Sequence, residues 1–264
     1  MLDLKNVSKT FHPGTVNART ALDDLSLHLN EGDFVTVIGG NGAGKSTLLN
    51  AIAGTFAVDS GSISIGGQDV SRLPEFKRAA LIGRVFQDPM QGTAATMQIE
   101  ENLALAARRG QPRGLRWGIT KAEREKYRAL LQPLDLGLED RLTAKVGLLS
   151  GGQRQALTLL MAALKQPKLL LLDEHTAALD PKTAAKVLSL SDQIVAENHL
   201  TTLKITHNKK DAIQHGNRLI MMYEGRIVID ISGEEKKKLT VPQLLELFSK
   251  VSGSDEADDK LLLS

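Results

Sequence analysis

The sequence predicts an α/β fold organised around a parallel sheet, and three observations along its 264 residues support this prediction. Residues Phe34–Ile38 are a run of β-forming residues that ends in glycines and is followed by helical spacing over Ser46–Ala53. From Gln153 onward, helical and extended patterns alternate, which is typical of βαβ units. The apolar run Leu169–Leu172 ends in two acids, at the strand edge where open α/β sheets bind ligands.

Composition excludes several classes of function. The 33 basic and 31 acidic residues leave a formal charge of +2, too little for the electrostatic footprint of a nucleic-acid binder, so we expect no nucleic-acid partner. The chain has no cysteine, which excludes disulfides, thiol nucleophiles and thiolate metal sites. The most apolar stretch, Leu157–Leu164, is far shorter than the roughly 18 residues that cross a bilayer. Any membrane role is therefore expected to work through a partner.

The remaining elements follow in order along the chain. Apolar alternation predicts two half-buried antiparallel strands at Leu2–Val7 and Leu25–Leu29, separated by a loop over Phe11–Thr20. Strands are expected at 62–65 and 82–86, and then helices at 97–108 and 121–134. The C-terminal part predicts helices at 153–164 and 181–197, a strand at 202–206, a hairpin of 219–222 with 227–231, and a last helix at 241–251.

Charged residues dominate two stretches near the C-terminus. The run Glu234–Lys238 is interpreted as a solvated surface, because consecutive charges are usually hydrated. Residues Ser252–Lys260 are polar and acidic, which predicts a disordered tail.

The segment Gly39–Ser46 fits the phosphate-loop pattern G-x-x-x-x-G-K-[ST], directly after an expected strand and at the start of an expected helix. Its glycines let successive N–H groups face one phosphate chain, and the helix adds its positive end. Lys45 adds a full positive charge, and the hydroxyl of Ser46 is a ligand of the kind that Mg²⁺ prefers. The pattern predicts binding of ATP with Mg²⁺; a glycine-rich turn with a surface lysine is the alternative.

Asp173 and Glu174 suit the chemistry that such a loop requires. The first acid would hold Mg²⁺ and the second would polarise the attacking water. Acids after a strand also cap the following helix, which is the structural alternative for this pair. His207 follows the expected strand at 202–206, so it could reach the same edge and contact a γ-phosphate, although a lone histidine is more often structural.

The segment Leu149-Ser150-Gly151-Gly152-Gln153 lies just before an expected helix and resembles the signature sequence of ABC-type ATPases. With the phosphate loop and the carboxylates, the resemblance extends from Leu2 to about Ile231. It implies an α/β P-loop NTPase (RecA-like) core with an antiparallel β subdomain and an inserted α-helical subdomain. The implied boundaries are a single domain over 1–231, with the core at 1–87 and 150–231 and the helical subdomain at 88–149, a helical extension at 232–251 and a tail at 252–264.

The resemblance also assigns roles residue by residue. Glu174 matches the catalytic base, His207 the switch histidine, and Lys45 the phosphate-loop lysine. The implied Mg²⁺ contacts are Ser46, Gln87 and Asp173. The implied nucleotide contacts are Phe11 (stacking on adenine), Gly39, Asn41, Gly42, Ala43, Gly44, Lys45, Ser46, Thr47, Gln87, Ser150, Gly151, Gly152 and Gln153. In the family the last four serve the ATP of a second copy, so two ATPs join a homodimer.

Some positions depart from the family pattern without removing a catalytic group. His175 replaces a common proline and Asn208 a frequent acid, and Ala156 and Met161 replace frequent arginines. The run from Asp173 to Asp180 resembles ATPases of tripartite-type importers, which have a separate solute-binding protein. Some of these relatives import aromatic amino acids.

Together these features predict the ATPase subunit of an importer, bound at the cytoplasmic face of the membrane through integral-membrane permease subunits. A soluble ABC ATPase, such as one for iron–sulfur assembly, is the alternative with the same ATP chemistry. A nucleotide-gated binding module without turnover is disfavoured by the presence of Glu174.

Overall fold

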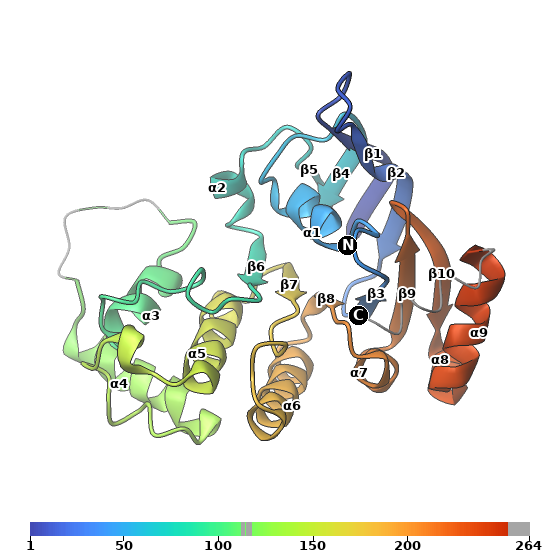
Figure 1. Cartoon of the computed structure of the whole chain (residues 1–264). Helices are drawn as coiled ribbons and strands as arrows, with labels where there is room; N and C mark the ends of the chain where they lie inside the picture. Colours follow the sequence, from blue (N-terminus) through green and yellow to red (C-terminus); the bar gives the residue numbers. More distant parts are fainter. Residues whose placement is uncertain (112–113, 115–117, 253–264) are drawn as a thin grey trace. The chain divides into compact units, whose positions relative to one another are not determined.

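The computed structural model describes residues 1–111, 114 and 118–252, and the chain forms two compact units (Figure 1). Unit 1 contains Met1–Leu81 and the chain from Leu200 onward, and unit 2 contains Ile82–His199. The tail expected over 252–264 lies outside the described residues from 253 onward. No helix among the described residues is long and apolar enough to span a bilayer.

The first sheet of unit 1 is antiparallel and contains β1 (Leu2–Phe11), β2 (Arg19–Leu29), β4 (Ser60–Ile65) and β5 (Gln68–Asp69) in the order β2-β1-β4-β5. The expected strands are confirmed, but β1 and β2 are longer than predicted. Their ladder continues through the pairs Thr10↔Thr20 and Phe11↔Arg19, which shortens the intervening loop. Paired leucines such as Leu2 and Leu29 are fully buried, as alternation requires of a half-buried sheet.

The second set of strands in unit 1 has β3 (Phe34–Ile38) between two parallel neighbours, β8 (Thr201–Ile205) and β9 (Arg218–Tyr223). All five residues of β3 are buried, which explains its apolar character, and the hydroxyl of its one polar residue, Thr36, donates to Ala212 O at 2.8 Å. β10 (Arg226–Ser232) pairs antiparallel with β9, and the predicted hairpin is confirmed. Glu224 and Gly225 at its turn have φ values of 46° and 80°, the positive pair that suits a tight hairpin. Helix α1 (Lys45–Ala53) follows β3.

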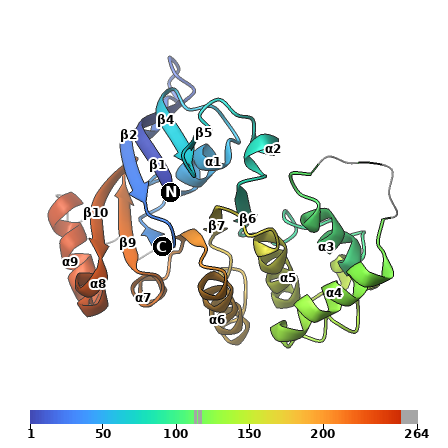
Figure 2. The same cartoon turned by 180° about the vertical axis from the view of Figure 1, so that it is seen from behind.

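Three helices complete unit 1: α7 (Lys209–Gln214), α8 (Gly233–Lys238) and α9 (Val241–Ser252). Helices α8 and α9 lie beside β10 in both views (Figures 1 and 2). Leu244 and Phe248 of α9 pack into a cluster with Ile38, Leu219 and Ile231. The helix predicted at 241–251 is thus part of the packed unit.

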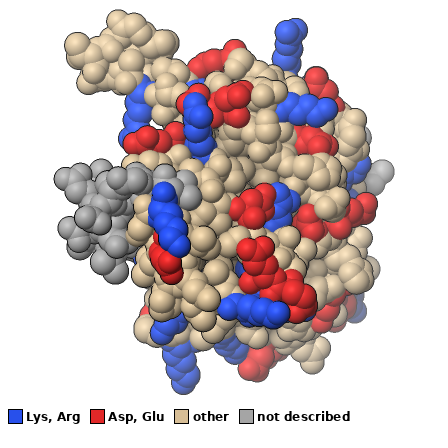
Figure 3. Space-filling model, turned by 90° about the vertical axis from the view of Figure 1, so that its right-hand side faces the viewer, with Lys and Arg blue, Asp and Glu red and all other residues tan. Residues whose placement is uncertain are grey.

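The interpretation of Glu234–Lys238 as a solvated surface is wrong at Lys236. This side chain is 2% exposed, and its Nζ donates to the carbonyls of His215 and Gly216, just beyond the end of α7. Carbonyls at a helix end lack intrahelical donors, so a buried ammonium satisfies them. Burial lowers the pKa of Lys236 to about 8. The other members of the run are exposed, and on the face shown in Figure 3 basic and acidic residues are interspersed.

Unit 2 pairs the parallel strands β6 (Ile82–Val85) and β7 (Leu169–Asp173). Its helices are α3 (Ile99–Ala107), α4 (Lys121–Leu131), α5 (Gly151–Ala163) and α6 (Pro181–Glu197), with 3₁₀ turns at Gln132–Leu134 and Val146–Leu148. The predicted helix at 181–197 is confirmed with the same bounds. Residues of α3, α4 and α5, among them Leu103, Tyr127 and Leu157, form one apolar cluster.

Arg78, at the end of the short helix α2 (Glu75–Arg78), stabilises the helix that follows the glycine loop. It is 2% exposed and its guanidinium donates to four carbonyls, including those of Ala51 and Ile52 at 2.8 and 2.9 Å in the last turn of α1. We expect Arg78→Met to lower the free energy of unfolding by about 2–4 kcal/mol, because several buried carbonyls lose their donors.

Urea unfolding followed by circular dichroism measures this change, and Lys77→Met is the matched control because Lys77 is exposed on the same helix. An Arg78 variant as stable as the Lys77 variant would contradict the capping role.

Candidate active site

The glycine loop of unit 1 joins the buried strand β3 to α1, as the sequence predicts. Lys45 is 6% exposed, and its Nζ donates to Gly39 O at 2.6 Å and Gly40 O at 3.0 Å, so the ammonium lies inside the loop. The N-cap of α1 is Gly44, and no side chain caps this end of the helix. The first-turn N–H groups of α1 are therefore positioned to bind an anion, together with the charge of Lys45.

Close packing against β9 explains the glycine at the start of the loop. A Cβ at Gly39 would lie 2.3 Å from the carbonyl oxygen of Met222, a contact that side chains do not make. The loop main chain can therefore follow this path only without a side chain at position 39.

Two further contacts lie near the loop. The first involves Arg19, which the sequence did not single out, and the second involves Phe11, which it did. Arg19 Nη2, at the start of β2, donates to Gly42 O at 2.8 Å and so ties the loop to the antiparallel sheet. Phe11, expected to stack on adenine, ends β1 and packs edge-to-face on Phe56, with ring centroids 5.3 Å apart. The aromatic residue is thus held by a neighbour in unit 1, and its stacking on a base stays a prediction.

His207 follows β8, next to the strand that leads into the glycine loop. The N–H of Thr206 donates to Val37 O at 3.2 Å, two residues before Gly39. Asn208 caps α7, because its Oδ1 accepts from the N–H groups of Lys210 and Asp211. The replacement of an acid at position 208 is therefore explained: an amide oxygen caps a helix as a carboxylate does.

In unit 2, the acids and Gln87 follow two neighbouring parallel strands. Because Val85 pairs with Leu172, Gln87 and the Asp173-Glu174 pair lie at the same edge. Arg84 Nη2 lies 3.7 Å from Asp173 Oδ2. Gln155 of α5, 1% exposed, donates to Phe86 O at 3.3 Å and so holds the residue before Gln87.

The main chain of Glu174 is left-handed, with a φ of 44°. For a residue other than glycine this conformation costs about 1–2 kcal/mol, and it persists where surrounding contacts enforce it. The next residue, His175, is 2% exposed, and its Nε2 lies 2.8 Å from Ser191 Oγ on α6. Sequence reasoning gave His175 no role beyond its place after Glu174.

The signature segment begins α5. Ser150 is the N-cap and forms a capping box with Gln153, in which Gln153 N donates to Ser150 Oγ and Ser150 N donates to Gln153 Oε1. The Gln153 amide also donates to Leu136 O at 3.1 Å, so this side chain serves the local structure of unit 2. Ser150 and Gly151 are exposed and Gly152 is buried, so the N-terminus of α5 reaches the surface of unit 2 at its first two positions.

The oxygen ligands that Mg²⁺ prefers are present among the predicted contacts: a hydroxyl (Ser46), an amide (Gln87) and a carboxylate (Asp173). The described part of the chain holds no cluster of three or more acids or histidines for a metal ion. Each of these groups is of a type that Mg²⁺ accepts alongside phosphate oxygens and water.

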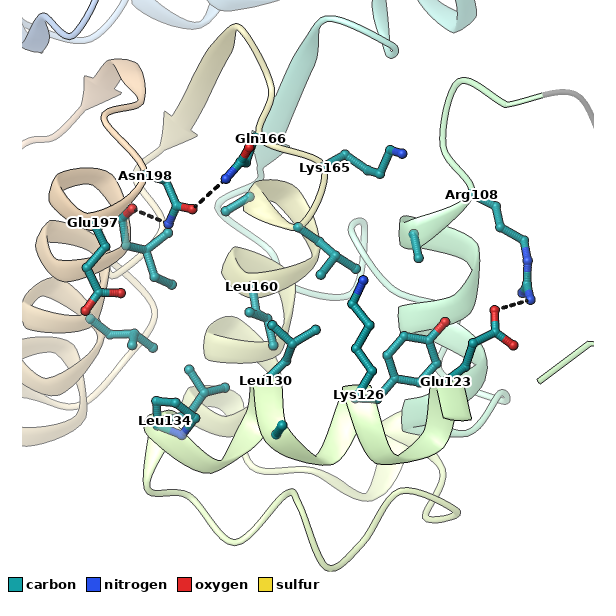
Figure 4. Close-up of a pocket in the computed structure, with 18 of the residues that line it drawn as sticks. Arg108, Glu123, Lys126, Leu130, Leu134, Leu160, Lys165, Gln166, Glu197 and Asn198 are labelled. Carbon is teal, nitrogen blue, oxygen red and sulfur yellow. Dashed lines mark hydrogen bonds and ion pairs between the residues drawn. The ribbon is translucent and has the colours of Figure 1, made fainter. Parts of the chain in front are cut away.

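Unit 2 also contains a hollow of about 1170 Å³ between α4, α5 and α6 (Figure 4). Arg108 and Glu123 lie at one end, Glu197 and Asn198 at the other, and leucines lie between them. None of the sequence-predicted site residues lines this hollow, so we assign it no part in nucleotide chemistry.

The model of the ABC transporter family matches residues 22–177. A tyrosine transport ATP-binding protein of Clostridioides difficile (strain R20291) is 46% identical over 248 residues, which cover 94% of this chain and 98% of that protein. The methionine import ATP-binding protein MetN of Rhizobium etli is 39% identical over 215 residues, 80% of this chain and 56% of that protein.

Among solved structures, a dimeric post-hydrolysis state of the ATP-binding cassette MJ0796 bound to ADP and Pi matches with a TM-score of 0.75. It is 30% identical, and the match covers 88% of this chain and 98% of that one. The fold predicted from the sequence is confirmed by this likeness.

The two glycines of the signature segment, Gly151 and Gly152, are predicted to differ in how well they tolerate an added side chain. A Cβ at Gly152 would lie 2.1 Å from Thr183 Cγ2 in α6, whereas a Cβ at Gly151 would lie 3.4 Å from Leu179 Cδ2. We expect Gly152→Ala to lower the free energy of unfolding by about 1–3 kcal/mol through overpacking, and Gly151→Ala to be neutral or slightly stabilising.

Thermal and urea unfolding measure both variants. Adding Thr183→Ser to Gly152→Ala removes the clashing methyl and should restore most of the loss. Equal stability of the two alanine variants would contradict the packing argument.

Proposed function

The chain belongs to the ABC transporter family as an ATP-binding subunit with ATPase activity, and we propose that it powers the import of an amino acid through a separate membrane permease. The observation that carries this proposal is the nearly full-length similarity to a tyrosine transport ATP-binding protein. The similarity to a methionine import subunit supports the same class of cargo. An aromatic amino acid is the specific substrate that we propose.

The proposed assembly follows from the family. Two copies of the chain associate with integral-membrane permease subunits, which places this protein at the cytoplasmic face of the membrane, bound through the permease. The resemblance of the Asp173–Asp180 run to tripartite importers supports a separate solute-binding protein in the same system.

For the phosphates of ATP, we propose the loop from Gly39 to Thr47 as the binding element, with the Lys45 ammonium and the N–H groups of α1 as donors. When bound, Mg²⁺ would neutralise phosphate charge, held by Ser46 and Asp173 with Gln87 nearby in its shell. Phe11 is proposed to contact the adenine.

Hydrolysis requires a base for the attacking water. In our proposal the Glu174 carboxylate accepts a proton from that water. The water oxygen bonds to the γ-phosphorus, and the bond between the γ-phosphorus and the ADP oxygen breaks. His207 donates to the γ-phosphate and so orients it for attack.

The signature segment is proposed to act in the dimer. Ser150, Gly151 and Gly152 of one copy present a hydroxyl and N–H groups to the γ-phosphate held by the other copy. Loss of that phosphate removes the contact between the two copies. Turnover therefore shifts the population from the closed dimer to the open one, and this change drives the permease.

Transport is the direct test of the proposed cargo. Cells lacking this chain should take up radiolabelled tyrosine at least about tenfold more slowly, with recovery on expression of the natural chain but not of Glu174→Gln, because removal of a general base costs about 10²–10⁴-fold. Unlabelled phenylalanine should compete better than unlabelled lysine. Unchanged uptake of aromatic amino acids, or copurification with soluble partners alone, would overturn the importer assignment in favour of a soluble ABC ATPase.

The dimer cycle makes a separate prediction. Glu174→Gln keeps the shape of the side chain but removes the base, so ATP binds and the closed dimer persists. Gel filtration with light scattering, in ATP and Mg²⁺, should show a stable dimer of this variant and mostly monomer for the natural chain. Glu197→Gln, on the exposed end of α6, is the control; a Glu174 variant that stays monomeric would contradict the sandwich.

A further inference from the structure

We infer that His175 is a positioning residue for the catalytic base: it holds the loop after β7 to α6 through Ser191 and thereby sets the direction of Glu174. The inference rests on the proposed role of Glu174 as base. It concerns a residue that itself contacts neither nucleotide nor water in the proposed reaction.

Burial and hydrogen bonding define this contact. His175 is 2% exposed and Ser191 is fully buried, and His175 Nε2 and Ser191 Oγ are 2.8 Å apart. Ser191 Oγ donates its only hydrogen to Val187 O, also at 2.8 Å, in the preceding turn of α6. It must therefore accept from His175, which assigns the hydrogen to Nε2 and orients the ring.

The loop between β7 and α6 is attached to α6 at both of its ends. At the far end, Asp180 is the N-cap of α6, and its side chain accepts from Thr183 N at 3.1 Å. At the near end, His175 reaches Ser191, about three turns further along the same helix. Between them, Ala177 N donates to Glu174 O at 2.9 Å and closes a turn.

Glu174 lies at the start of this loop in a left-handed conformation, which the surrounding contacts must enforce. The bond from the adjacent residue to a buried serine is a contact of that kind. A proline at position 175, common in the family, would restrict the preceding residue through its ring. Such a ring favours extended backbone before it, whereas Glu174 is left-handed here, so histidine permits this conformation and its side chain adds a bond to α6.

A small displacement of a base is enough to slow a reaction, since misplacement by about 1 Å can cost about a hundredfold in rate. Loosening of the His175–Ser191 bond should therefore lower kcat. Because neither residue belongs to the phosphate-binding loop, KM for ATP should stay the same.

The test compares Ser191→Ala with Ser189→Ala, an exposed serine on the same helix, in the full-length chain assembled with its permease. We expect Ser191→Ala to lower kcat about tenfold to a hundredfold with KM within about twofold, and Ser189→Ala to behave as the natural chain. His175→Gln, which keeps an N–H donor for Ser191, should retain more of kcat than His175→Leu.

A second arm distinguishes positioning from general loss of structure. In a Glu174→Gln background the base is absent, so adding Ser191→Ala should not reduce the residual turnover further. A kcat for Ser191→Ala equal to that of Ser189→Ala, or an equal further loss in the Glu174→Gln background, would overturn the inference. The proposed function fails on a different result, namely full turnover by Glu174→Gln itself.

Discussion

Buried cations that donate to main-chain carbonyl oxygens hold unit 1 together where its helices and loops end. Lys45 donates to the carbonyls of the glycine loop, Arg78 to the last turn of α1, and Lys236 to the chain just beyond α7. Carbonyls at such ends lack intrahelical donors, and a cation taken out of water needs acceptors. Each contact therefore satisfies two groups that would otherwise be buried at a cost. Burial lowers the pKa of both Arg78 and Lys236, as expected for cations removed from water.

In unit 2, two neutral side chains support the edge shared by β6 and β7. Gln155 donates to the carbonyl before Gln87, and Ser191 joins His175 to α6. Amide and hydroxyl groups bury at a lower cost than charges, provided that each finds a partner. The first contact positions the chain after β6, and the second positions the chain after β7. The residues next to Gln87 and Glu174 in the sequence are thus the ones held by these hydrogen bonds.

Most of the fold was accessible from the sequence because its signals are local. Apolar runs, glycines and helix-capping residues lie within a few positions of what they specify, and the helix at 181–197 and the hairpin at Glu224-Gly225 illustrate this. The short helix α7 was not predicted, and α8 was predicted only as part of a helical extension over 232–251. Helices of six residues have little stability of their own and form here because tertiary contacts satisfy their ends.

The supporting contacts of the site were beyond the reach of a single sequence. Gln155 bonds to a residue 69 positions away, and Arg19 to one 23 positions away. The residue type shows that a side chain can donate a hydrogen bond, but it does not show which distant carbonyl will accept that bond. The phosphate loop and the carboxylate pair could be predicted because the proposed chemistry requires residue types at fixed spacing, whereas a supporting residue needs only to lie near its partner in the fold.

Positions 175 and 208 illustrate how the two kinds of constraint differ. Asn208 supplies a capping oxygen to α7 where an acid is frequent in the family, and His175 anchors a loop where proline is common. In each case the substitution acts on the backbone: an amide oxygen caps a helix as a carboxylate does, and a histidine permits the left-handed conformation of the residue before it. In the proposed mechanism Lys45 and Glu174 are under a narrower constraint, since a cation must neutralise phosphate charge and a base must accept a proton. Departures from the family pattern are therefore expected in the supporting residues first, and a substitution next to a catalytic group is best understood by the backbone that it holds.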